Sequence, residues 1–304
     1  MQIRKLSDVL KEQYGAKVLK LSLTSGCTCP TRDGTKGWNG CSFCSAGGSG
    51  EFAARYAPIR EQIAEAKALV DSKFPKDLPL SGRRYIAYFQ SFTNTYGDRA
   101  ALEALYREVL ALPEIVLLSI GTRPDCLGRE MVDMLVSLNR IKPVWIELGL
   151  QTIHEETAKA FGRGYTLSVF EDAYSALKAE GLAVIVHLIL GLPGETREMM
   201  LDSVRYLARL KPPPDGVKLQ QLYILRGTEM AKTYQAEPFP LMSLEEYTDL
   251  IVESLALLPP ETVIHRLTGD PPKRLLIAPS WCADKKRVLG TLQRKIRSEK
   301  NSAQ

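Results

Sequence analysis

Apolar, β-branched runs alternate with amphipathic segments between residues 17 and about 235 of this 304-residue chain. Gly, Pro or Asn marks nearly every boundary, and most of the segments between the runs have the helical period. The six runs lie at residues 17–23, 85–90, 115–120, 144–148, 183–190 and 216–224. Such alternation predicts parallel βαβ units, and strands that are hydrophobic throughout predict a sheet covered on both faces.

The alternation does not decide whether the sheet curls into part of a barrel or stays open. In both arrangements, ligands bind at the carboxyl ends of the strands. After about residue 236 we expect one more helix, a Pro-rich linker and a basic terminal helix. We therefore divide the chain into an N-terminal helix (1–16), an α/β region (17–235) and a C-terminal extension (236–304).

Hydropathy and the N-terminal pattern predict a soluble, cytoplasmic protein without a membrane contact. The longest apolar runs are far shorter than the roughly 20 residues of a membrane span. The charged, amphipathic start has no continuous apolar stretch of the kind found in a secretion signal. In the cytoplasm stable disulfides are rare, so a cluster of cysteines indicates a metal site instead.

Four of the six cysteines lie in one loop, CTCPTRDGTKGWNGCSFC, directly after the first predicted strand. Their spacing is C-x-C-x11-C-x2-C. Four thiolates can form a tetrahedral zinc site, although C-x-C is a tight pair for a single centre. A set of three, Cys29, Cys41 and Cys44, leaves one metal position open, as a catalytic centre requires. The spacing alone leaves both possibilities open.

The segment TCPTRDGTKGWNGCSFC, followed by SAGGSGEFA, resembles the cluster loop of radical S-adenosylmethionine (SAM) enzymes. It most resembles a bacterial subfamily with an extended C-x11-C-x2-C loop. Over roughly residues 15–290 the chain is also similar to the radical SAM half of the Elongator catalytic subunit and to oxygen-independent coproporphyrinogen oxidases. The resemblance implies an α/β fold, a partial (β/α)6 TIM-like barrel with a short C-terminal α/β extension.

The resemblance also implies the cofactors and the first step. Cys29, Cys41 and Cys44 would hold a [4Fe–4S] cluster whose fourth iron binds SAM. A flavodoxin- or ferredoxin-like protein would supply one electron, and reductive cleavage of SAM would give a 5′-deoxyadenosyl radical. Cys27 would not be a ligand, and Cys126 would be a small packing residue.

Four further motifs, at residues 88–96, 119–127, 147–166 and 186–196, follow predicted strands and match SAM-binding positions of the relatives. With the aromatic residue of the cysteine loop, the SAM-binding candidates are Phe43, Gln90, Ser91, Thr93, Arg123, Glu147, Gln151, Arg163 and His187. Two of these have alternatives, since Arg123 can face an acidic substrate group and His187 can be a hydrogen-bonded interior residue. The chain departs from the relatives at Tyr165, where His is usual.

The C-terminal segment carries the substrate candidates. Arg266 and Asp270 are expected to cover the barrel mouth, and Cys282 is either a hydrogen donor near the radical site or a packing residue. From His265 onward there are ten Lys or Arg and three Asp or Glu, so this segment carries about +7 and the rest of the chain about −2. A basic segment of this kind can bind RNA or can be a solvated helix face.

These features predict a radical SAM enzyme that modifies a tRNA nucleoside, with a wobble uridine side chain as the expected target. Two alternatives remain open at this point. One is a radical SAM enzyme with a protein or small-molecule substrate. The other is a zinc-clipped RNA-binding module that uses all four clustered cysteines.

Overall fold

A sheet of eight parallel strands forms the centre of the computed structural model, which describes residues 3–302. Its strand order is β1-β9-β7-β6-β5-β4-β3-β2. The strands are β1 (Arg4–Lys5), β2 (Val18–Leu23), β3 (Arg84–Phe89), β4 (Ile115–Thr122), β5 (Val144–Gln151), β6 (Ala183–Leu190), β7 (Gly216–Gln221) and β9 (Val263–Arg266). A separate antiparallel pair is formed by β8 (Ile224–Leu225) and β10 (Leu276–Ala278).

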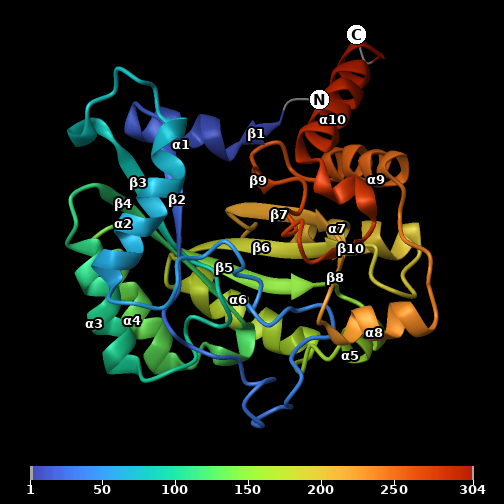
Figure 1. The fold of residues 1–304 in the computed structure, drawn as a ribbon, viewed down its shortest axis with the longest axis horizontal. Coiled ribbons are helices and arrows are strands. Elements are labelled where there is room, and N and C mark those ends of the chain that lie inside the picture. Colours follow the sequence, from blue (N-terminus) through green and yellow to red (C-terminus); the bar gives the residue numbers. More distant parts are fainter. Residues whose placement is uncertain (1–2, 303–304) are drawn as a thin grey trace.

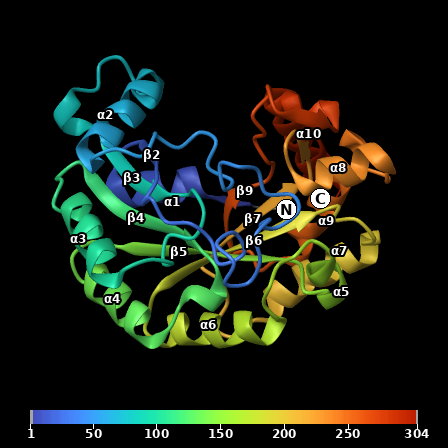
Figure 2. The ribbon, with the colours of Figure 1, turned by 60° about the horizontal axis from the view of Figure 1, so that its bottom comes forward.

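Helices surround the curled sheet (Figure 1, Figure 2). They are α1 (Leu6–Tyr14), α2 (Ile59–Val70), α3 (Arg99–Leu110), α4 (Arg129–Asn139), α5 (Glu155–Ala160), α6 (Leu167–Ala179), α7 (Arg197–Arg209), α8 (Glu229–Ala236), α9 (Leu244–Leu257) and α10 (Lys285–Ser302). Short 3-10 turns lie at Asp71–Lys73, Leu80–Gly82, Pro124–Cys126 and Ser280–Ala283. Figure 2 shows α3, α4 and α6 on the convex side of the half-barrel. The predicted partial barrel is therefore confirmed.

Helix α3 illustrates how the amphipathic pattern forms this layer. Asp98 caps its first turn by accepting a hydrogen bond from the Ala101 amide at 2.8 Å, as its position after a strand-end turn leads one to expect. Leu102 and Tyr106, one turn apart, are buried against the sheet, where the Tyr106 ring lies 5.0 Å from that of Phe89 in an edge-to-face arrangement. The helical period thus directs one face of α3 into the core.

The sheet continues beyond the six predicted strands, which differs from the expected end of the alternation after residue 236. β9 pairs with β7, and β1 pairs with β9, both in parallel. Neither strand was visible as an apolar run, because β9 contains His265 and Arg266 and β1 consists of two exposed charged residues held by backbone hydrogen bonds. Part of the C-terminal segment therefore belongs to the same sheet. The domain division itself stays a prediction.

The predicted sixth strand is also shorter than expected. It ends at Gln221, and residues 224–225 turn away to pair with β10. The basic terminal helix is present as α10, which packs on α9 and projects from the body in Figure 1. Within residues 3–302, no helix is long and apolar enough to cross a membrane.

Candidate active site

A cavity of about 180 Å³ opens where the strands end on the concave side of the sheet. Residues from segments far apart in the sequence line it. The predicted site residues in its lining are Cys29, Cys41, Phe43, Cys44, Gln90, Thr93, Arg123, Glu147, Gln151, Arg163, His187 and Arg266. Twelve of the fifteen candidate positions are thus brought to one cavity, while Ser91, Asp270 and Cys282 are not in its lining.

The cysteine loop is held over the cavity by hydrogen bonds within the loop and to two other parts of the chain. Arg32 donates through Nη2 to the carbonyl oxygens of Cys44 and Ser45, at 2.8 and 2.7 Å. The Ser42 amide donates to the Phe161 carbonyl after α5, and the Ser42 carbonyl accepts from the amide of Met230 in α8, both at 2.8 Å. The loop is therefore fixed by backbone contacts as well as by its own turns.

The thiols in the cavity have weak polar partners, and burial raises the proton affinity of Cys41 and Cys44. Cys41 Sγ lies 3.7 Å from the Gly162 carbonyl oxygen, and Cys44 Sγ lies 3.7 Å from Ser49 Oγ. Burial, with Cys44 and Cys29 nearby, raises the pKa of Cys41 to about 12, and burial raises the pKa of Cys44. Coordination by a metal removes such a proton outright.

This donor set fits an iron–sulfur cluster. Three thiols face one cavity, and the guanidinium groups of Arg123 and Arg32 favour negative charge on Cys41. Among residues 3–302, no three His, Cys, Asp or Glu side chains are grouped as ligands of a single ion. The thiols of Cys29, Cys41 and Cys44 are thus arranged around a shared space and not around one point.

The other three cysteines lie elsewhere. Cys27 packs into the main core, where a Cβ at Gly97 would lie 3.1 Å from its sulfur. Cys282 is 2% exposed and accepts a hydrogen bond from Gln221 Nε2 at 3.2 Å. Burial raises the pKa of Cys126 and of Cys282 to about 12. Because Cys27 is outside the cavity, the four thiols of the loop do not share one site.

The segment after β3 is bound directly to the cysteine loop. Gln90 donates through Nε2 to the Ser49 carbonyl at 2.7 Å, and the Thr93 amide donates to the Thr28 carbonyl at 3.2 Å. Ser91 is buried against Gly50, where an added Cβ would lie only 1.8 Å from Ser91 Oγ. Gly50 is thus required for this close approach, and Ser91 faces the loop backbone.

Arg163 organises the end of β5. Its guanidinium is 1% exposed and donates to the carbonyl oxygens of Leu150, Thr152 and Tyr165, at 3.1, 2.7 and 2.9 Å. Tyr165 donates its hydroxyl to the Gly149 carbonyl at 2.7 Å. Both side chains therefore hold the strand end that presents Gln151 to the cavity.

Arg123 is positioned by an acidic neighbour. Its Nε and Nη2 atoms donate to the two carboxylate oxygens of Asp125, at 3.0 and 2.9 Å. Nη2 also donates to the Arg163 carbonyl at 2.8 Å. Hydrogen bonding to Asp125 outweighs the effect of burial and raises the pKa of Arg123, so this guanidinium is a fixed positive charge beside the thiols.

Backbone strain is concentrated in the cavity wall. Ser49, Phe92 and Gln151 have φ values of 64°, 59° and 65°, and all three line the cavity. They are the non-glycine residues with positive φ within the described part of the chain. Left-handed backbone costs a non-glycine residue roughly 1–2 kcal/mol, and such strain is typical of functional sites.

A buried polar network forms the floor of the cavity around Glu147. Its Oε1 accepts from Lys20 Nζ at 3.0 Å and from Ser119 Oγ at 2.8 Å. Its Oε2 lies 2.9 Å from His187 Nε2 and accepts from Lys218. Burial lowers the pKa of Lys20 to about 7 and that of His187 to about 3, so His187 is neutral and donates its Nε2–H.

Sequence reasoning missed Lys20 and Lys218. A signal was present, since each lysine interrupts an otherwise apolar strand, in KVLKLSL and GVKLQQ. Their partner could not be read from the pattern, because Glu147 lies on β5 while the lysines lie on β2 and β7. Asp270, in contrast, pairs with Lys285 at 2.7 Å on the outside.

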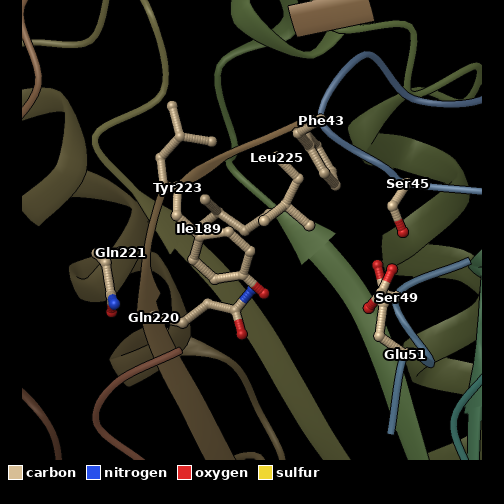
Figure 3. Close-up of a pocket in the computed structure, with 10 residues that line it drawn as sticks. Phe43, Ser45, Ser49, Glu51, Ile189, Gln220, Gln221, Tyr223 and Leu225 are labelled. Atoms are coloured by element: carbon tan, nitrogen blue, oxygen red, sulfur yellow. The ribbon is translucent and has the colours of Figure 1, made fainter. Parts of the chain in front are cut away.

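A smaller pocket of about 30 Å³ adjoins the cavity and shares five lining residues with it, among them Phe43 and Tyr223. Figure 3 shows Glu51 on one side of it, opposite Tyr223 and Gln220. Oε1 of Glu51 and Oγ of Ser45 are buried without a hydrogen-bond partner in the described structure. Sequence reasoning gave Glu51 no role, and nothing in the pattern GGSGEFA marked it.

Comparison with known proteins accounts for this arrangement. The model for the radical SAM superfamily matches residues 34–207, and that for the radical SAM C-terminal domain matches residues 214–298. YtqA of Bacillus subtilis is 40% identical over 288 residues, which are 94% of this chain and 87% of YtqA. Elongator complex protein 3 of Homo sapiens is 26% identical over 240 residues, 73% of this chain and 43% of that protein.

Solved structures agree with these matches at the level of the fold. Elp3 of the archaeon Methanocaldococcus infernus superimposes with a TM-score of 0.67 at 19% identity, over 91% of this chain and 63% of that one. This chain therefore spans less than two thirds of that structure. Coproporphyrinogen III oxidase (HemN) of Escherichia coli gives a TM-score of 0.52 at 18% identity, over 79% and 52%. The chain belongs to the radical SAM superfamily, whose enzymes use a [4Fe–4S] cluster and S-adenosylmethionine.

Proposed function

We propose that this radical SAM enzyme binds its cluster through Cys29, Cys41 and Cys44 and modifies a tRNA nucleoside in the cytoplasm, at a wobble uridine side chain. When bound, the cluster and SAM supply one-electron cleavage of the sulfonium. An external flavodoxin- or ferredoxin-like reductant is expected. The chain's own residues must then hold SAM, exclude water and position the nucleoside.

Different residues of the cavity lining suit different parts of the SAM molecule. Arg123 is a fixed cation beside the thiols and suits a carboxylate, while Gln90, Thr93 and Gln151 offer amide and hydroxyl groups for its polar atoms. Phe43 lies 5.2 Å from Phe161 between ring centroids, which makes one apolar wall suited to a flat base. Arg163 and Tyr165 contribute by holding the strand end.

The sequence similarity to Elongator complex protein 3, which is 26% identical over 73% of this chain, is the observation that carries the choice of tRNA. Helix α10 supports it. Lys286, Arg287, Arg294 and Arg297 are exposed on this helix, and none forms an ion pair with a described residue. Four unpaired cations on one helix match the charge of a nucleic-acid backbone.

Anaerobic turnover with and without bulk tRNA tests this proposal. The reconstituted enzyme should form 5′-deoxyadenosine faster when tRNA is present, and the nucleosides of a deletion strain should show a changed mass at the wobble uridine. The Cys41→Ala variant serves as the control for cluster-dependent chemistry. An unchanged nucleoside profile together with 5′-deoxyadenosine formation that ignores tRNA would favour a protein or small-molecule substrate.

A further inference from the structure

The floor of the cavity holds more positive than negative charge. Lys20, Lys218 and Arg266 gather around one carboxylate, that of Glu147. The repulsion is evident in the lysines, since burial lowers the pKa of Lys218 well below its usual value and Lys20 and Arg266 lower it further. A buried excess of one sign destabilises a fold unless a ligand or counter-ion offsets it.

Strand register explains why these cations are neighbours. Lys218 on β7 is the direct partner of Arg266 on β9 and of His187 on β6. Their side chains therefore stand in one row, and His187 and Arg266 of this row line the cavity. His265, next to Arg266, has its pKa held well below the ordinary value by burial and adds no charge at neutral pH.

Arg266 is the cation of this row that is free to bind a ligand. One hydrogen bond engages it, from Nη1 to Gln220 Oε1 at 3.3 Å, and no described carboxylate lies within ion-pair distance. Glu51, the acid on the wall of the adjoining pocket, forms no ion pair with it. A guanidinium has five N–H donors, so most donors of Arg266, which lines the cavity, have no hydrogen-bond partner among the described residues.

Tyr88 supplies a second donor beside Arg266. Its hydroxyl oxygen accepts from Lys218 Nζ at 3.1 Å, and no acceptor for its own proton lies in the described residues. Both lysine ammonium groups sit against the Tyr88 ring, at 4.7 and 4.6 Å from its centroid. The ring is thus held rigidly, and its O–H is available to a group in the cavity.

We infer that the floor of the cavity is a subsite for a carboxylate of the substrate, bound by the Arg266 guanidinium and the Tyr88 hydroxyl. This inference rests on the proposed function in one respect, that substrate enters this cavity. A monoanion is favoured over a phosphate dianion. Lys20 and Lys218 already pair with Glu147, so among the described groups of the floor Arg266 is the cation left to match a single negative charge, and its planar guanidinium suits a carboxylate.

A pair of isosteric probes tests the subsite without any nucleic acid. Acetate and acetamide differ in charge and hardly in shape, and their binding to the SAM-loaded holoenzyme is measured by titration calorimetry at constant ionic strength. Wild type should bind acetate at least tenfold more tightly than acetamide. Arg266→Gln should remove this preference, and Tyr88→Phe should weaken acetate binding several-fold. The matched control Arg140→Gln, at an exposed arginine after α4, should keep it.

Two further measurements distinguish a substrate carboxylate subsite from a cofactor site and from a phosphate site. The affinity of Arg266→Gln for SAM should stay within twofold of wild type, and a parallel loss of SAM binding would overturn the inference by assigning the cations to the cofactor. Binding of inorganic phosphate but not acetate would overturn the choice of a carboxylate. Failure of the tRNA test with acetate binding intact would reject only the proposed substrate class. Acetate binding that survives Arg266→Gln would reject only the subsite.

Discussion

Nε2 of His187 lies 2.9 Å from Oε2 of Glu147, so a neutral imidazole on β6 donates to a fully buried carboxylate on β5. The same carboxylate accepts from Lys20 and Ser119, on β2 and β4. Residues of four strands thus meet at one acid, and this meeting sets the polarity of the cavity floor.

His187 is expected to remain neutral throughout the physiological pH range. Burial lowers its pKa to about 3, with Arg266 and Lys20 contributing. Because the folded state then binds fewer protons than the unfolded state, the free energy of unfolding should fall as the pH falls from about 6.5 towards 3. His187→Asn should reduce this slope by at most about 1.4 kcal/mol per pH unit. Urea unfolding across pH 4.5–7 measures the slope, and a ring nitrogen NMR spectrum showing protonation at pH 6 would contradict the assignment.

Removal of a cluster ligand should abolish cluster and activity together. Cys29→Ala, Cys41→Ala and Cys44→Ala should each lose most of the iron, about four atoms per chain in the wild type, and all SAM cleavage. Cys27→Ala is the matched control, expected to keep both at a cost of about 1 kcal/mol for the lost packing. Iron analysis and 5′-deoxyadenosine assays decide. A variant with full iron and cleavage would remove that cysteine from the ligand set.

The left-handed backbone at Gln151 should be measurable as strain. Gln151→Gly relieves it, whereas Gln151→Ala keeps it while removing the same side-chain amide. The glycine variant should therefore be more stable than the alanine variant by about 1 kcal/mol, and both should bind SAM equally weakly. Denaturant unfolding and SAM titration provide the two readings. Equal stability of the two variants would show that the φ of 65° carries no cost.

Arg163 should be required for folding as well as for the site. A lysine in its place cannot reach the carbonyl oxygens of Leu150, Thr152 and Tyr165 together, so buried acceptors lose their donors. Arg163→Lys should lower the free energy of unfolding by about 2–4 kcal/mol. Arg140→Lys, at the exposed control position, should change it by less than about 0.5 kcal/mol. An Arg163→Lys protein of wild-type stability would refute this role.

The basic face of α10 should determine how salt affects tRNA binding. We consider a fourfold variant with glutamine at Lys286, Arg287, Arg294 and Arg297. This variant should bind bulk tRNA more weakly, and the slope of log K against log salt should decrease in magnitude by up to about 3. Filter binding between 50 and 200 mM salt is suitable. The double variant Arg140→Gln/Arg209→Gln controls for charge elsewhere on the surface. An unchanged slope would show that the basic face of α10 is a solvated surface that does not bind tRNA.

Local patterns were sufficient for much of the architecture and for the identity of the cluster loop. The six apolar runs became β2 to β7, because strands covered on both faces are hydrophobic along most of their length. The loop could be recognised because Cys29, Cys41 and Cys44, the predicted cluster ligands, lie within one short stretch of chain. Strands β1 and β9 escaped detection, since they are short, polar and held by backbone pairing with a neighbour distant in the sequence.

The amino-acid sequence alone determined the βα alternation, the cysteine loop and the superfamily, since each depends on residues close together in the chain. Which side chains meet in the cavity depends on strand order and register, which bring Lys20, Glu147 and Lys218 together across more than 120 residues of sequence. The same packing buried Cys282 in the core and turned Asp270 outward to Lys285. The residues of the charge network are distant in the sequence, so they come into contact only in the folded sheet.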